Sequence, residues 1–124
     1  MHNKSLVIEV LEQIDTAITT IKDRFKPVDS VDYFIDTPQG QEKLDSICML
    51  FIAIGEGLKN IDKLTDKKLL TQYPNIDWKA IKGMRDILSH HYFDMNAEAI
   101  YNVCKDDINE LHTTIKQIII DIYA

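Results

Sequence analysis

The stretch LDSICMLFIAIGEGLKNI, residues 44–61, has apolar side chains on nearly every side of the helix that its spacing predicts. One stripe repeats at three- and four-residue steps, as expected of a core-facing helix: Leu44, Ile47, Cys48, Phe51, Ile54, Leu58 and Ile61. Leu50, Ile52 and Ala53 add apolar surface on the other sides. Such a helix is either central in a bundle or shared with a second copy of the chain.

Two glycines, Gly55 and Gly57, interrupt this helix, although glycine in a helix interior costs about 1 kcal/mol relative to alanine. Close approach of another helix would explain both. Glu56, between them, is interpreted as a solvated or salt-bridged carboxylate, and the alternative is a buried acid near a functional site.

Local signals predict where this helix and its neighbours begin and end. Thr37 is the expected N-cap of the apolar helix, with Pro38 in its first turn. A first helix covers residues 5–25, and Pro27 stops it. Residues 26–38 are expected to be a loop, with a short turn or helix around residues 30–35. Residues 66–72 are predicted to form a short helix with Asp66 as its cap.

Two further helices follow. Asp77 is the expected N-cap of a helix that the turn FDMN, residues 93–96, ends. Asn96 then caps a last helix, whose apolar stripe continues to Ile122. The helix after Asp77 has an expected inner face: Ala80, Ile81, Met84, Ile87, Leu88 and His91. Strand-like alternation of useful length does not occur, so the sequence predicts an all-α antiparallel bundle of four main helices plus one short helix.

The composition is that of one globular domain, residues 1–124. Of the 124 residues, 45% are hydrophobic and 27% are charged, which excludes a disordered or collagen-like chain. The sequence has no apolar run of the roughly 18 residues that a membrane span needs, and its N-terminus has no signal-peptide pattern. We therefore expect a cytoplasmic protein without a membrane partner.

The spacing of the cysteines and the distribution of charge limit which classes of function fit the sequence. Cys48 and Cys104 are expected to be buried free thiols, and no metal site or cofactor site is predicted because closely spaced ligands are absent. The net charge of −6 argues mildly against RNA or DNA as a partner. Residues 59–91, however, contain seven basic and four acidic residues. One end of the molecule could therefore meet a polyanion, although a solvated helix face would have the same pattern.

The chemistry-bearing residues lie in WKAIKGMRDILSHHYFDMN, residues 78–96. Arg85, His90 and Tyr92 offer a cation, a titratable imidazole and a phenol near a helix end. On a regular helix, Arg85, Ser89 and Tyr92 share one stripe with Lys82 beside them, whereas His90 lies about 140° round the axis from Arg85. Either the helix frays near Ser89 and His90 swings round, or a symmetry mate completes the site.

These residue types suit cleavage of RNA. A histidine can take a proton from a ribose 2′-OH or give one to the leaving 5′-oxygen. An arginine can bind the phosphate and stabilise charge on its oxygens. Because RNA supplies its own nucleophile, the chemistry requires no metal ion. Arg85 and His90 are the candidate catalytic residues.

Structural interpretations compete with these roles. The alternative interpretation of Arg85 is a surface salt-bridge partner of Asp86 or of an acid of the last helix, and His91 is interpreted as a packing histidine of the inner face. His2 and His112 are interpreted as incidental surface residues, and Trp78 as a packing anchor.

The segment GMRDILSHHYFDMN, residues 83–96, closely resembles the signature of the HepT-like proteins, the toxin branch of the HEPN superfamily. In that family an arginine is followed by four residues, a histidine, one residue and a tyrosine. Arg85, His90 and Tyr92 match these positions, and Asp86 stands where relatives often have a polar residue. His91 stands where relatives frequently have glycine, so the catalytic imidazole is either His90 or His91.

The resemblance implies a helical homodimer with the two motifs facing a shared cleft. It further implies a metal-independent endoribonuclease, the toxin of a toxin–antitoxin pair, that cleaves tRNA or mRNA. Its expected antitoxin is an MntA-type nucleotidyltransferase that transfers AMP onto Tyr92. Supporting residues of the expected site are Lys82, Asp86, Ser89 and His91. Two alternatives remain: a non-catalytic helical partner of a nucleotidyltransferase, and a structural bundle without a site.

Overall fold

The computed structural model describes residues 3–124 and consists of helices joined by short connections. The first long helix, α1, spans Lys4–Phe25, α3 spans Pro38–Leu64, and α4 spans Trp78–His90. The last helix consists of three consecutive pieces: α5 (Ala97–Asn102), the π-helical segment η3 (Val103–Asp107) and α6 (Ile108–Tyr123). Residues 3–124 contain no strand, so the predicted all-α class is confirmed. His2, interpreted as a surface residue, lies outside the described residues.

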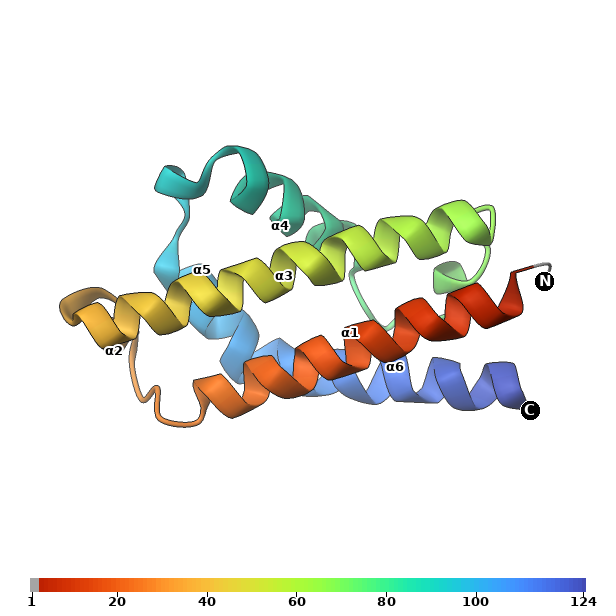
Figure 1. Cartoon of the computed structure of the whole chain (residues 1–124), viewed down its shortest axis with the longest axis horizontal. Coiled ribbons are helices and arrows are strands. Elements are labelled where there is room, and N and C mark those ends of the chain that lie inside the picture. Colours follow the sequence, from red (N-terminus) through yellow and green to blue (C-terminus); the bar gives the residue numbers. More distant parts are fainter. Residues whose placement is uncertain (1–2) are drawn as a thin grey trace.

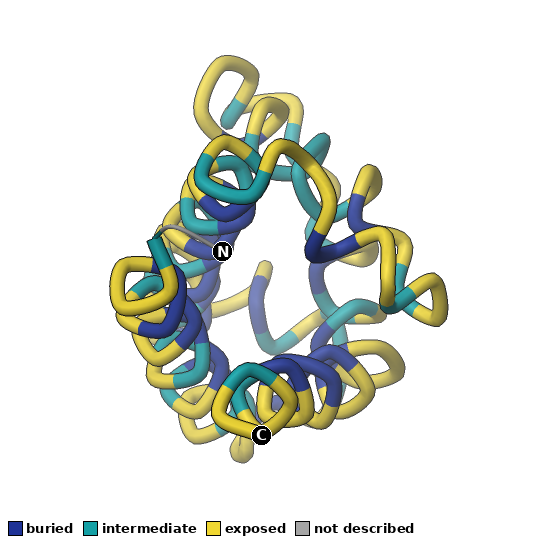
Figure 2. The backbone as a smooth tube through the Cα atoms, turned by 90° about the vertical axis from the view of Figure 1, so that its right-hand side faces the viewer, coloured by how far each residue is buried: buried dark blue, intermediate teal, exposed yellow. Residues whose placement is uncertain are grey.

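The long helices run alternately in opposite directions (Figure 1), which confirms the antiparallel bundle. α3 packs against α1 on one side and against α4 on the other, and α1 also packs against α6. Figure 2 shows the bundle from one end, with the buried positions turned inward. The largest fully buried side chains include Leu11, Ile18, Phe51, Ile54, Leu58 and Ile115. The apolar stripe of α3 is therefore central to the core, as its sequence predicts.

Side-chain caps fix the N-terminal ends of α3, α4 and α5, as predicted. The Thr37 hydroxyl accepts a hydrogen bond from the Gly40 N–H at 2.9 Å. The Asp77 carboxylate accepts one from the Ala80 N–H at 3.0 Å, and Asn96 accepts from the first amides of α5. Each cap satisfies a backbone donor that the first helical turn leaves without a partner.

The short helix lies elsewhere than expected. Asp66 and Lys67 have φ values of 53° and 61°, which a right-handed helix does not accommodate, so the helix predicted over residues 66–72 is wrong. Only the single 3₁₀ turn η1, Leu70–Gln72, forms there. The short helix is instead α2, Val31–Asp36, which confirms the short turn or helix expected around residues 30–35. Its Phe34 is completely buried, so tertiary packing stabilises it.

Gly55 and Gly57, the two interior glycines of α3, mark a close helix approach, which confirms that interpretation. A Cβ built on Gly55 would overlap the Cβ of Arg85 on α4. A Cβ on Gly57 would lie 3.0 Å from side-chain atoms of Ile14 on α1. The position of α4 on α3 therefore depends on the missing side chain at Gly55.

The expected inner face of α4 is only partly buried. Leu88 is buried and Ile81 and Met84 are half-buried, but Ile87 is 52% exposed and Ala80 is exposed. The prediction was too wide because α4 makes its main contacts with a single long helix, α3. Trp78 is a packing anchor, as predicted: it is buried, and its Nε1–H donates to the Tyr73 carbonyl at 2.9 Å.

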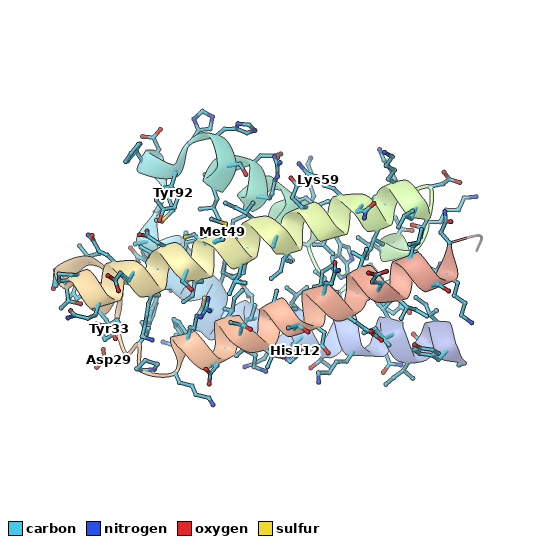
Figure 3. The ribbon with its side chains drawn as sticks, viewed as in Figure 1. Asp29, Tyr33, Met49, Lys59, Tyr92 and His112 are labelled. Atoms are coloured by element: carbon cyan, nitrogen blue, oxygen red, sulfur yellow. The ribbon has the colours of Figure 1, made fainter. Side chains whose placement is uncertain are left out.

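The structure also shows the surroundings of the two cysteines and of His112, and whether a described helix could span a membrane. Cys48 and Cys104 are buried free thiols, as expected, and burial raises the pKa of each to about 12. The interpretation of His112 as a surface residue is wrong (Figure 3), because it is buried between α1 and α6. Its Nε2 lies 2.5 Å from Asp15 Oδ1 and its Nδ1 lies 3.1 Å from Lys22 Nζ. Residues 3–124 include no helix long and apolar enough to cross a membrane.

Candidate active site

The motif residues lie where α4 ends against α3. The helix stays regular through His90, so it does not fray near Ser89. His91 then leaves helical geometry with φ −136° and ψ 42°, and the 3₁₀ turn η2, Tyr92–Asp94, follows. Tyr92 therefore does not continue the helical stripe of Arg85 and Ser89 that sequence geometry predicted.

Three contacts in which α3 supplies the carboxylate join α4 and its continuation to α3 in antiparallel order. Lys82 Nζ lies 2.5 Å from Asp62 Oδ2, Arg85 pairs with Glu56, and the Tyr92 hydroxyl donates to Asp45. As the chain proceeds through α4, its partners move backward along α3. The candidate site is thus a seam between two helices, and α3 supplies a carboxylate to each of these three residues.

Arg85 is held close to α3. Its side chain is 24% exposed, and its guanidinium forms ion pairs with Glu56 and, at 3.0 Å from Nη1, with Asp86 Oδ1. Both the expected partner Asp86 and the salt-bridged reading of Glu56 are found. A guanidinium in this position can exchange a carboxylate for a phosphate, because both present two oxygens to its planar fork.

Tyr92 reaches from η2 toward α3, as Figure 3 shows. Burial, followed by the hydrogen bond to the Asp45 carboxylate, raises the pKa of the Tyr92 phenol well above its ordinary value. The phenol therefore stays protonated near neutral pH. The sequence reasoning missed Asp45. Its spacing of eleven residues from Glu56 places both acids on one face of α3 and could have revealed it.

Both candidate imidazoles are open to solvent. His90 ends α4 and is exposed, and His91 is also exposed. The interpretation of His91 as a packing histidine is wrong, because the helix ends one residue before it and no longer directs it to the inner face. Ser89 is exposed as well. Either histidine can exchange protons with a bound substrate.

Asp86 connects the motif to a second basic residue. It accepts hydrogen bonds from Lys59 Nζ at 2.6 Å and from Arg85 Nη1 at 3.0 Å. These two bonds lower the pKa of the Asp86 carboxyl below its ordinary value. Lys59, Arg85 and Asp86 therefore form one charged cluster beside the seam. Residues 3–124 contain no group of three or more His, Cys, Asp or Glu side chains placed to hold a metal ion.

Comparisons with known proteins agree with the family resemblance. The family described as Ribonuclease HepT-like matches residues 14–118. "Probable ribonuclease HepT" of Thermococcus cleftensis is 30% identical over 103 residues, which cover 83% of this chain and 86% of that protein. No solved structure matches the chain.

Two shorter matches are more similar in sequence. "Putative RNase MJ0127" of Methanocaldococcus jannaschii is 36% identical over 69 residues, 52% of this chain and 54% of that protein. "Putative RNase TTE0752" of Caldanaerobacter subterraneus subsp. tengcongensis is 38% identical over 66 residues, 53% of this chain and 55% of that protein. The match spans about half the length of these two relatives. The family match covers most of the chain, and the match to the Thermococcus cleftensis protein covers 83% of it. The chain therefore belongs to the HepT-like family of the HEPN superfamily.

Proposed function

We propose that this chain is an endoribonuclease that cleaves cellular RNA, tRNA or mRNA, without a metal ion, as the toxin of a toxin–antitoxin pair. The observation that carries the proposal is a solvent-open histidine, His90, at the end of a helix that also holds Arg85, in a chain of the HepT-like family. The relatives named as ribonucleases support it.

The reaction uses the substrate's own hydroxyl. His90 accepts the proton of a ribose 2′-OH, and the 2′-oxygen attacks the adjacent phosphorus. The P–O5′ bond breaks, which leaves a 2′,3′-cyclic phosphate on one product and, after protonation of the leaving oxygen, a 5′-hydroxyl on the other. Arg85 stabilises the charge that builds on the non-bridging phosphate oxygens. To do so, its guanidinium must release at least one of its carboxylate partners, Glu56 or Asp86.

A second copy of the chain completes the site in this proposal. Because α4 is regular through His90, the step of five positions from Arg85 to His90 turns the side chain by about 140° around the helix. A homodimer that faces the two motifs across a cleft brings the Arg85 of one protomer toward the His90 of its partner. Exposed apolar side chains near the motif support this arrangement: Met49, 66% exposed, and the half-buried Ile52 on α3, and Phe93, fully exposed, next to Tyr92.

Tyr92 is the proposed point of control. An MntA-type nucleotidyltransferase transfers AMP from ATP onto the Tyr92 oxygen, and pyrophosphate leaves. The transfer removes the phenol proton, so the hydrogen bond to Asp45 is lost. The new phosphodiester also carries a negative charge next to the Asp45 carboxylate and close to where RNA phosphate must bind. Modification would therefore both displace the Tyr92 side chain and repel the substrate.

Cleavage of an RNA oligonucleotide without added metal tests the enzymatic part. We expect His90→Ala to abolish cleavage and growth inhibition while leaving the circular dichroism spectrum unchanged. His91→Ala is the matched control, since both histidines are exposed neighbours, and it should retain activity. Retained activity in His90→Ala together with loss in His91→Ala would move the general acid–base role to His91. Full activity in the double variant would refute the proposal.

The modification is tested separately by intact mass. Co-expression with a cognate nucleotidyltransferase should add one or more AMP units to the wild-type chain and none to Tyr92→Phe. An unchanged mass of the wild-type chain, or AMP that persists in Tyr92→Phe, would contradict the assignment of Tyr92.

A second candidate function is a non-catalytic helical partner that serves a nucleotidyltransferase as its substrate. Two observations favour it: Arg85 is already paired with carboxylates, and the chain carries a net charge of −6. The RNA assay separates the two candidates, because only the first requires cleavage that depends on a histidine of the motif.

A further inference from the structure

A basic groove lies between α3 and α4, near the C-terminal end of α3 and the N-terminal half of α4. Its volume is about 650 Å³. Five lysines line it: Lys59, Lys63 and Lys67 from α3 and the turn after it, and Lys79 and Lys82 from α4. Asp62 and Asp86 are the two acids of its lining. We call this surface the lysine groove.

Two of the five lysines are neutralised within the groove. Lys59 pairs with Asp86 at 2.6 Å, and Lys82 pairs with Asp62 at 2.5 Å. Among residues 3–124, no carboxylate lies within ion-pair distance of Lys63, Lys67 or Lys79. The groove therefore has three uncompensated positive charges in a chain whose net charge is −6. Grouping of like charge on one concave surface favours an anionic partner with several charges.

The lysine groove leads to the proposed catalytic histidine. Lys79, Lys82, Asp86 and His90 follow one another at three- and four-residue steps, so they lie within about 80° on one face of α4. From Lys79 to His90 the helix rises roughly 16 Å. Asp86 binds both Lys59 of the groove and Arg85 of the motif. Figure 3 labels Lys59 on α3, on the side that faces α4.

The lining also indicates which part of a bound nucleic acid the groove would contact, the phosphates or the bases. It contains lysines, two aspartates and a glycine, but no aromatic residue on which a base could stack. Lysine ammonium groups contact phosphates without reading base identity. The groove thus suits a sugar–phosphate backbone rather than a sequence of bases.

From these observations we infer that the lysine groove binds the backbone phosphates of single-stranded RNA to one side of the cleaved bond and leads the strand to His90. The inference rests on the proposed ribonuclease function and adds two properties to it. The chain prefers substrates that extend beyond the cleaved dinucleotide, and it tolerates any sequence in the nucleotides that cross the groove.

The test uses Lys63→Ala/Lys67→Ala/Lys79→Ala, a triple variant that removes the unpaired lysines and leaves Lys82 and the motif intact. The control removes three exposed lysines elsewhere, Lys26, Lys105 and Lys116, with the same change in net charge. The binding probe is a 2′-O-methyl RNA about 12 nucleotides long, which cannot be cleaved because its 2′-oxygens are blocked. Fluorescence anisotropy at increasing salt gives the affinity and its salt dependence, and circular dichroism checks the fold of both variants.

We expect the groove variant to bind about tenfold more weakly than the wild type and to lower the salt slope of log K by about 2, since each lost phosphate contact contributes about 0.7. Its kcat/KM should fall on the long RNA and stay unchanged on a dinucleotide. The control variant should match the wild type on both substrates.

Equal affinity of the groove variant and the wild type, or an equal loss in the control, would overturn the inference. So would a groove variant that binds RNA normally but no longer binds its nucleotidyltransferase, because the groove would then be a protein-docking surface. Failure of the proposed function gives a different result: the wild type would not cleave RNA, or cleavage would persist without the motif histidines, while the binding experiment would still report on the groove.

Discussion

Tyr92 shows how one hydrogen bond ties a proposed modification site to the bundle. Its hydroxyl donates to Asp45, which lies 47 positions earlier in the chain on α3. Burial and the Asp45 carboxylate both favour the protonated phenol, so the folded chain holds this proton more tightly than the unfolded chain does. The resulting contribution to stability is complete below the ordinary tyrosine pKa of about 10 and declines as pH rises above it.

Asp45→Asn should lower the Tyr92 pKa, because the amide removes the negative charge that opposes ionisation. The value should stay above that of a free tyrosine, since burial is the larger cause of the shift and persists. Ultraviolet difference titration measures the phenol, with Asp45→Asn/Tyr92→Phe as the reference that identifies its signal among five tyrosines. An unchanged titration would show that the carboxylate does not hold this phenol.

At the scale of the element, the contact between α3 and α4 decides where the motif lies. Gly55 allows the backbone of α3 to approach Arg85, and the Arg85–Glu56 and Lys82–Asp62 pairs align the two helices. α4 buries mainly Trp78 and Leu88, which is a small apolar face for a helix of thirteen residues. The position of α4 therefore depends on the Gly55 contact more strongly than the position of a deeply buried helix depends on any single contact.

Gly55→Ala should destabilise the fold by about 1–3 kcal/mol, because the added methyl group overlaps Arg85 and pushes α4 away from α3. Gly83→Ala on α4 is the matched control. A Cβ there meets no atom within 4 Å, so this change should stabilise the helix by about 0.5–1 kcal/mol. Urea denaturation compares the two free energies of unfolding. A stable Gly55→Ala with wild-type activity would show that the seam tolerates a wider spacing.

At the scale of the whole molecule, the proposed site depends on a second copy of the chain. Met49 lies on the same face of α3 as Asp45 and Glu56, four residues after the first and seven before the second. Phe93 contacts Tyr92 through its ring, with centroids 6.5 Å apart. Exposed apolar side chains on both α3 and η2, near the Tyr92–Asp45 contact, are suited to bring two motifs together.

Met49→Glu should shift the chain toward monomer and reduce RNA cleavage in parallel, since a buried unpaired carboxylate opposes association. Ile120→Glu is the control: it places the same charge at a residue of α6 that is 60% exposed. Sedimentation velocity over a range of protein concentrations measures the assembly. A Met49→Glu variant that remains as dimeric and as active as Ile120→Glu would place the interface elsewhere.

The sequence by itself determined the long helices and the N-caps of three helices. Apolar spacing and the capping residues Thr37, Asp77 and Asn96 act within a few residues of the chain, so local physics predicts them. It also predicted that Gly55 faces another helix, and it singled out Arg85, His90 and Tyr92 by their residue types near a helix end and by the family resemblance. Their catalytic roles stay a prediction.

Only the tertiary structure decided which side chains meet. Asp45 with Tyr92, Glu56 with Arg85, and Asp15 with His112 are distant in sequence, and the antiparallel packing of separate helices brings them together. Sequence periodicity also misplaced His91, since the last helical residue of α4 is set by its packing and its transition into η2. The physical reason is the same in each case: a helical repeat fixes the direction of a side chain within its own helix, but the partner depends on how whole helices dock.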